Sequence, residues 1–264
     1  MTNATLLEYE DHWPTELGGV SVVDGTVTFR GHDLLNALED LSWMDLLMYG
    51  ITGRRFSQAQ LELFQGLWKI SVSYPEPRIW NNRVAALGGS TRSPGGLSLG
   101  AAIAVTDAAI YGQRPMIGAF DFLQRAHAAH EHGTVLEDFI TRELKTHRTI
   151  PGYGRPIRSV DERLAPAERL AKRLSLWGGP YTQLSVEVAE VLKDYRMGMN
   201  VAAIAAALYA DQGLTTTEYN YATLLAFSAG QIVCHMDARA HPPGALFPLR
   251  CDRIAYQGPS RRGW

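Results

Sequence analysis

Apolar residues recur at helical spacing along most of this chain, and that periodicity limits the fold more than any other feature. Leu34, Leu38, Leu41 and Met44 lie three or four residues apart, which would place them on one face of a helix. The same spacing returns in later segments up to about residue 239. Strand signals occur only around Asp24-Gly25, which separates two runs rich in β-branched residues. The sequence therefore predicts an all-α fold with a short N-terminal β-hairpin over residues 20–23 and 26–29.

Capping residues and stop signals give the expected helix ends. A helix is expected to open at Asp33, Asn200 to cap a helix over 201–212, and Gly213 to end it. One last long helix is expected over about 218–239. Three pairs have the spacing of capping boxes, in which each residue bonds the backbone N–H of the other. They are Ser57 with Gln60, Thr134 with Glu137, and Thr215 with Glu218.

Charge and hydropathy argue against several classes of function. The 264 residues carry a net charge of −2 without a run of like charges, so we expect no nucleic-acid partner. Apolar stretches such as 201–210 fall well short of the roughly 20 residues that cross a bilayer, so we expect no membrane span. The N-terminus lacks the apolar core of a signal peptide. Cys234 and Cys251 have no metal-ligand spacing, and we expect a reduced, cytoplasmic protein.

The segment 149–158 is rich in proline and glycine and carries most of the candidate ligand-binding residues. Gly152 and Gly154 free the backbone to approach a ligand closely, while Pro151 and Pro156 stiffen the turn.

Cationic side chains surround the same segment. Arg155 and Arg158 lie in it, and Asp161 and Arg163 follow within about one helical turn. Arginine forks make charge-assisted hydrogen bonds to phosphate and carboxylate groups, so the pattern suits a small anionic ligand. The alternative is an ordinary interhelical loop whose arginines are solvated.

Three further patterns have open interpretations. The glycine-rich segment 88–96 could form an anion-binding nest at a helix N-terminus, or be a flexible loop. The histidines between 127 and 132 could hold a metal, but histidines at helix ends are more often solvated, and we expect no metal site. His235 is either a buried, hydrogen-bonded histidine or a catalytic group, with Asp237 and Arg239 as partners.

Six segments, in order along almost the whole chain, resemble motifs of the citrate synthase and citryl-CoA lyase family. Those segments are Val23 to Leu34, Ser42 to Ser57, Pro151 to Arg163, Met199 to Ala202, Cys234-His235, and Ile254 to Arg261. They resemble, respectively, the opening ribbon with Y-R-G, the helix exit L-x-x-G-x-x-P-T, P-G-[FY]-G-H-P with D-P-R, N-V-D, A-H, and Y-x-G-P-x-x-R. The short length is more similar to the citryl-CoA lyase module than to a full citrate synthase.

This resemblance implies one citrate synthase-like unit over residues 1–264. It would have a large helical domain at about 1–145 and 213–264, a small domain at about 146–212, and a cleft between them. Such proteins form homodimers or higher homo-oligomers and make or break a carbon–carbon bond between an acyl-CoA and a keto acid. By position, coenzyme A would be held by Pro151, Gly152, Gly154, Pro156, Arg158 and Arg261. Arg163 would grip a substrate carboxylate.

Several positions depart from the family's catalytic pattern. The catalytic aspartate falls at Ala202, the loop histidine at Arg155, and the thioester-polarising histidine near Leu99. An upstream substrate histidine meets Tyr74-Pro75, and a substrate arginine meets Ser228. Alanine cannot act as a base, and losing a positioned base typically costs about 10²–10⁴ in rate.

Two functions follow from the retained and replaced residues together. The first is an enzyme with altered carbon–carbon bond chemistry on an acyl-CoA or carboxylate substrate, with no tightly bound cofactor and a coenzyme A thioester as substrate. Its candidate catalytic residues are Arg155, Asp161, Arg163, His235, Asp237 and Tyr153. The second is an inactive scaffold or regulatory subunit that pairs with a citrate synthase-like partner.

Overall fold

The computed structural model of the chain describes residues 3–10, 12–71, 75–109, 112–155, 160–246, 250–260 and 263. Its internal contacts divide the chain into two compact units. Unit 1 comprises Met1–Ile70 and Met116–Thr223, and unit 2 comprises Ser71–Pro115 and Leu224–Trp264. This division follows other boundaries than the large and small domains expected from the resemblance, and those domains stay a prediction.

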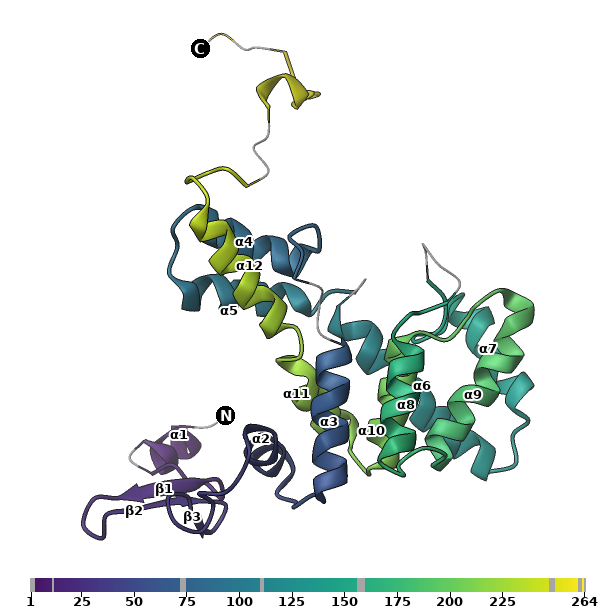
Figure 1. Cartoon of the computed structure of the whole chain (residues 1–264), viewed down its shortest axis with the longest axis horizontal. Helices are drawn as coiled ribbons and strands as arrows, with labels where there is room; N and C mark the ends of the chain where they lie inside the picture. The colour runs from purple at the N-terminus through teal and green to yellow at the C-terminus, as the bar shows by residue number, and fades with distance from the viewer. Residues whose placement is uncertain are drawn as a thin grey trace. The chain divides into compact units, whose positions relative to one another are not determined.

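Helices dominate both units, and the all-α fold class is confirmed (Figure 1). In unit 1 and at its borders lie α1 Asn3–Tyr9, β1 Gly18–Ser21, β2 Thr26–Phe29, β3 His32–Asp33, α2 Trp43–Thr52, α3 Gln58–Ser71, α6 Gln113–Glu131, α7 Leu136–His147, α8 Leu164–Arg173, α9 Pro180–Leu192, the 3-10 turn Lys193–Tyr195, α10 Val201–Asp211 and α11 Thr216–Leu224. In unit 2 lie α4 Trp80–Ser90, α5 Gly95–Thr106, α12 Ser228–Ala240 and the 3-10 turn Cys251–Arg253. Among the described residues, no helix is both long and apolar enough to cross a bilayer.

The N-terminal hairpin is confirmed, with a shorter first strand than expected. β1 and β2 pair antiparallel from Gly18↔Phe29 to Ser21↔Thr26, and β3 adds a third strand. Val22 and Val23 lie in the turn and are 91% and 95% exposed. Val22 and Val23 do not pair with the neighbouring strand, because the chain already turns at residues 22–25. Gly25, at φ 65°, allows this turn, and a hydrogen bond from Ser21 Oγ to the Asp24 carboxylate stabilises it.

The helix expected to open at Asp33 is wrong. Asp33 ends β3, and its carboxylate accepts hydrogen bonds from the backbone N–H groups of Leu35 and Asn36. An aspartate that bonds the backbone just ahead favours a turn over a helix. Residues 34–40 accordingly form turns, and α2 begins only at Trp43, after the Ser42 side chain caps Asp45 N.

Two of the three expected capping boxes are confirmed. Ser57 with Gln60, and Thr215 with Glu218, bond each other's backbone N–H reciprocally. The Thr134 pair is wrong, because Val135 occupies the N-cap of α7 without a side-chain bond. The last long helix is also broken in two, since α11 ends at Leu224 and α12 begins at Ser228.

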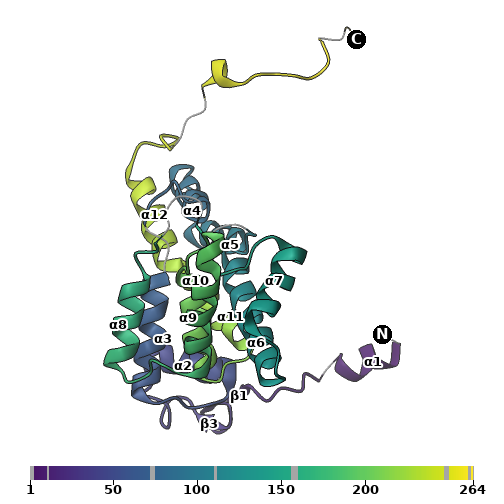
Figure 2. The ribbon, with the colours of Figure 1, turned by 90° about the vertical axis from the view of Figure 1, so that its right-hand side faces the viewer.

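α10 forms the centre of unit 1. Asn200 caps it as expected, and every residue from Val201 to Ala210 is buried. α10 packs against α8 and α9, which Figure 2 shows beside it. Its stripe of alanines lets these neighbours approach closely, and the chain's own helices cover it on all sides. Its apolar circumference is therefore covered within the chain and does not indicate a contact between subunits.

Unit 2 is built on α4, α5 and α12, which pack directly on one another (Figure 1). Gly88 and Gly89, expected in a loop, lie inside α4. A Cβ on Gly88 would lie 2.1 Å from Ser98 Oγ of α5, and a Cβ on Gly89 would lie 2.2 Å from the His235 carbonyl oxygen of α12. These glycines therefore allow close helix packing, and the loop between α4 and α5 shrinks to residues 91–94.

Candidate functional site

The loop after α7 runs beside the residues that precede α10, and hydrogen bonds join the two segments. Gly154 N donates to the Gly198 carbonyl at 2.6 Å, and Asn200 N donates to the Gly152 carbonyl at 2.9 Å. Asn200 Nδ2 also donates to the Gly154 carbonyl at 3.0 Å. The helix cap of α10 is therefore the same residue that holds the loop in place.

The two loop glycines have different surroundings. Both have φ of +88°, where side chains other than glycine are strained. A Cβ on Gly152 would lie 2.8 Å from the Ala203 Cβ and 3.0 Å from the Ala119 Cβ. Among the described residues, a Cβ on Gly154 would meet only Met197 Cε, at 4.0 Å. Gly152 thus serves packing between α6 and α10, and Gly154 leaves open space beside the backbone.

Asp161 connects this loop region to the N-terminus of α10. Its buried carboxylate accepts from Arg163 N at 3.0 Å and from Arg163 Nε and Nη2 at 2.9 Å each. Its Oδ2 also accepts from Val201 N, the first residue of α10, at 2.9 Å. A carboxylate at a helix N-terminus is favourable because free N–H groups and the helix dipole both attract it.

The charge state of Asp161 follows from these bonds. Burial alone would raise the pKa of its carboxyl group, but the hydrogen bonds from Arg163 and Val201 N outweigh burial and lower the pKa. Asp161 is therefore ionised at neutral pH and fully engaged with donors. This geometry favours a positioning role for Asp161 over proton transfer.

Arg155 lies close to the same carboxylate. Its Nη1 donates to Glu162 Oε2 at 2.7 Å and to the Val160 carbonyl at 3.1 Å, and it lies 3.8 Å from Asp161 Oδ1. The two guanidinium groups of Arg155 and Arg163 thus stand beside two carboxylates. Pro156, Arg158 and Arg261, which were also expected at the site, lie outside the described residues.

Tyr153 points into the core of unit 1. Its hydroxyl is buried and donates to the Ser185 carbonyl at 3.0 Å. Burial raises the pKa of this hydroxyl, so the ionised form is disfavoured. Tyr153 anchors the loop by packing and by this bond, and its geometry gives little support for proton transfer.

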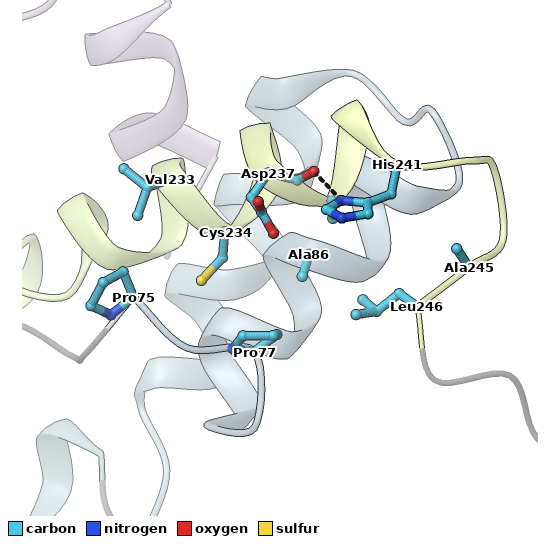
Figure 3. A pocket seen from close by; sticks show the side chains of 10 residues that line it. Pro75, Pro77, Ala86, Val233, Cys234, Asp237, His241, Ala245 and Leu246 are labelled. Atoms are coloured by element: carbon cyan, nitrogen blue, oxygen red, sulfur yellow. Dashed lines mark hydrogen bonds between the residues drawn. The ribbon is translucent and has the colours of Figure 1, made fainter.

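His235 and Asp237 lie on α12, which belongs to unit 2, whereas Tyr153, Arg155, Asp161 and Arg163 belong to unit 1. His235 is buried, with Nδ1 3.3 Å from the Ala85 carbonyl oxygen. Asp237 is exposed and lines a hollow of about 590 Å³, together with Cys234, His241, Leu246 and two prolines. Figure 3 shows the Cys234 sulfur and the Asp237 carboxylate on the same side of α12. Burial, with a smaller effect of Asp237, raises the pKa of the Cys234 thiol.

Known proteins resemble this chain in structure. No family model matches it, and no curated protein matches it by sequence. The citryl-CoA lyase of Hydrogenobacter thermophilus superposes with a TM-score of 0.81 at 17% identity, over 96% of this chain and 97% of that one. ATP citrate lyase from Methanothrix soehngenii, in complex with citrate and coenzyme A, superposes with a TM-score of 0.76 at 19% identity, over 98% of this chain and 45% of that one. Citrate synthase from Thermotoga maritima superposes with a TM-score of 0.64 at 16% identity, over 86% of this chain and 60% of that one.

This chain has the citrate synthase-like fold. The structures agree with the sequence resemblance, including its short form, because the chain spans nearly the full length of the citryl-CoA lyase. It spans less than half of the ATP citrate lyase chain.

Ala202, at the position where the resemblance places the catalytic aspartate, is the second residue of α10 in this citrate synthase-like chain. It is buried, and its N–H donates to the Asn200 side chain at 2.9 Å. Leu99 lies within α5, and Ser228 begins α12 with its hydroxyl bonded to the Leu225 carbonyl. Tyr74 lies outside the described residues.

Sequence reasoning missed the network that joins the loop to α10. Asn200 was expected as a helix cap and as part of the segment that resembles N-V-D, and its bond to Gly154 was not foreseen. Asp161 was expected as a proton-transfer candidate, and its bond to Val201 N was not foreseen. Forty residues separate Asp161 from Val201, so no local spacing could signal that pairing. No group of three or more metal-ligating side chains gathers anywhere in the described residues.

Proposed function

We propose that this chain is an enzyme that forms or cleaves a carbon–carbon bond in an acyl-CoA or carboxylate substrate, with the catalytic pattern of citrate synthase altered. A coenzyme A thioester would be a substrate, and no cofactor would be tightly bound. The likeness to citryl-CoA lyase over 96% of this chain supports the reaction class. Loop residues 151–158 would hold coenzyme A, with Arg261 as a further contact.

The orientation of Arg163 carries this proposal. Asp161 occupies Arg163 Nε and Nη2, while Nη1 makes no hydrogen bond within the described residues. A guanidinium fixed on one edge is preorganised to grip a ligand carboxylate with its remaining donors, because less rotamer freedom is lost on binding. Arg155 stays protonated at neutral pH, so it would stabilise an oxyanion instead of cycling a proton.

Calorimetric titration of the full chain with coenzyme A, acetyl-CoA and citrate tests the proposal. Arg163→Lys keeps a cation for Asp161 but removes the fork, so we expect citrate binding to weaken about tenfold, or 1.4 kcal/mol. Arg173→Gln is the matched control, since Arg173 lies on the exposed end of α8 and pairs with Glu62. If none of these anions binds at millimolar concentration, the enzyme proposal fails.

A scaffold or regulatory subunit remains the second proposal, and Ala202 is the observation that favours it. A methyl group offers no base at the position where the family has its aspartate, and Arg155 and Arg163 are both next to carboxylates. Affinity capture from the native host separates the two functions. A stoichiometric citrate synthase-like partner supports the scaffold, and a homo-oligomer alone supports the enzyme.

A homodimer or higher homo-oligomer is also proposed, with α5 as its surface. α5 is strongly apolar, yet only Ser98, Ala102 and Thr106 are buried in it. Leu97 is 73% exposed and Val105 is 37% exposed, and the small residues Gly100, Ala101 and Ala104 between them are also exposed. An apolar helix face of this kind is a typical contact between subunits. The tail beyond Pro248, which is exposed at residues 250 and 252–260, would reach across this dimer.

A further inference from the structure

A hollow of about 590 Å³ lies in unit 2, beside the contact between α4 and α12. Small buried residues form its floor, among them Ala86 of α4 and Ala238 of α12. Figure 3 shows Pro75 and Pro77 on one side of this space and Leu246 on the other. Sites for small molecules typically have volumes of about 300–1,000 Å³ and mainly apolar walls, and this hollow has both properties.

The polar groups of the hollow are acceptors of hydrogen bonds. Apart from the Cys234 thiol, the described residues that line it carry two polar side chains, those of Asp237 and His241. The Asp237 carboxylate makes no hydrogen bond or ion pair with any described residue. His241 Nδ1 is 2.9 Å from the Asp237 carbonyl oxygen, which can only accept, so Nδ1 carries the hydrogen and Nε2 of the neutral ring accepts. A ligand that pairs with these groups must therefore be a donor.

Negative charge surrounds the same space. Burial raises the pKa of the Cys234 thiol, and the charges of Asp237 and Glu76 raise it further, so both carboxylates act on a group that lines the hollow. Arg78 pairs with Glu76, but no Lys or Arg is among the described lining residues. The hollow would repel an anion, whereas a cation with an apolar body would match both its charge and its walls.

We propose that this hollow binds a small organic cation, in which a primary ammonium group is attached to an aromatic or aliphatic body. The ammonium group would donate to the Asp237 carboxylate and to His241 Nε2, while the apolar body would lie on Ala86, Ala238 and Leu246. Such a ligand has the opposite charge to the substrates of the proposed function. The proposal gives Asp237 a binding role in place of the proton transfer expected from the sequence.

Methyl NMR of the full chain, titrated with three indole compounds of similar size, tests the charge of the ligand. Tryptamine carries a primary ammonium group, tryptophol has a hydroxyl group in its place, and indole-3-propionate carries a carboxylate. We expect tryptamine to shift the methyl signals of Ala86, Ala238 and Leu246. It should bind about fivefold more tightly than tryptophol, which is the effect of one partly exposed ion pair. Indole-3-propionate should leave these signals unshifted.

Two aspartate substitutions in unit 2 locate the charge that matters. Asp237→Asn keeps the shape of the side chain and removes its charge, so tryptamine should bind about fivefold more weakly while tryptophol binds as before. Asp107→Asn is the matched control, because Asp107 is paired with Arg114 and is not among the described residues that line the hollow. Its affinity for tryptamine should equal that of the native chain. Both aspartates are exposed, so both variants are expected to fold.

Three results would overturn the proposal. In the first, tryptamine at a concentration on the order of 10 mM leaves the three methyl signals unshifted. In the second, tryptophol binds as tightly as tryptamine, which would mean that the hollow does not select a cation. In the third, Asp237→Asn binds tryptamine as tightly as Asp107→Asn does. The binding of coenzyme A and citrate is measured separately, so these results leave the proposed function untouched.

Discussion

Replacing Asp161 by asparagine should destabilise unit 1 substantially. The carboxylate accepts four hydrogen bonds, three from Arg163 and one from Val201 N. Asparagine keeps the shape, but its NH₂ group must face two donors: Arg163 Nη2 and Val201 N in one orientation, or Arg163 N and Nε in the other. Breaking a buried charged pair costs about 3–5 kcal/mol, and the partly exposed Arg163 reduces this, so we expect a loss of about 2–4 kcal/mol. The melting temperature should fall by roughly 5–10 °C.

Glu162→Gln is the matched control for this change. Glu162 is the next residue and also carries a carboxylate bonded to arginine, but its side chain is 44% exposed. Exposed ion pairs contribute about 0–1 kcal/mol, so the control should melt within about 2 °C of the native chain. Thermal denaturation followed by circular dichroism measures both variants. If Asp161→Asn melts no lower than Glu162→Gln, the carboxylate does not hold the loop to α10 and the positioning argument is refuted.

Acid pH offers an independent check on Asp161. Its folded-state pKa is lowered, so its ionised form stabilises the fold at every pH above the unfolded value of about 3.9. That contribution is lost as the pH falls through the folded-state pKa, because the proton must then be taken up in the native state as well. Denaturant titrations between about pH 5 and pH 2 should show a steeper loss of stability in the native chain than in Asp161→Asn.

Three other predictions concern the loop, the replaced base and α5. Gly152→Ala should lower the free energy of unfolding in urea by about 2–4 kcal/mol, because the new methyl would lie 2.8 Å from a side-chain carbon of α10. Gly154→Ala should lower it only by the strain of the positive φ, about 1–2 kcal/mol. Equal losses in the two variants would contradict the packing role of Gly152. Arg155→His should weaken the binding of an anionic ligand by roughly 1–3 kcal/mol in calorimetry. It should not create citrate-forming activity, which needs Ala202→Asp as well. If Arg155→Ala leaves binding and activity unchanged, Arg155 is only a solvated loop residue. Leu97→Glu should reduce the molar mass in light scattering by breaking the proposed α5 contact, and a native chain that is already monomeric at micromolar concentration would remove the oligomer prediction.

Local chemistry made much of the fold predictable. The Asp24-Gly25 turn, the Ser57 and Thr215 capping boxes, and Asn200 with Gly213 around α10 all behave as the sequence indicates. Each depends on residues within a few positions of one another, so tertiary packing had little to override.

The wrong predictions came where two local signals competed or where packing decided. Asp33 begins an apolar helical pattern, but its own carboxylate bonds the backbone ahead of it and favours a turn. Gly88 and Gly89 suggest a loop in isolation, and only the neighbouring helices explain why glycine is needed there.

The candidate site could be predicted in its members but not in its pairings. The resemblance and the loop composition drew attention to Gly152, Gly154, Arg155, Asp161 and Arg163. Their partners come from α6, α9 and α10, far away along the chain. The bonds from Tyr153 to Ser185 and from Val201 to Asp161 cross 32 and 40 residues, so periodicity carries no information about them.

The burial of α10 has a consequence for local opening of the protein. Residues 203–208 are at most 1% exposed, and their amides should exchange with deuterium only when unit 1 unfolds as a whole. The loop of Gly152 and Gly154 is bonded to the first residues of that helix, so the loop is attached to a slowly exchanging segment at one end. A ligand seated on the loop would then slow exchange at Gly154 and Asn200 while leaving the already protected amides of α10 unchanged.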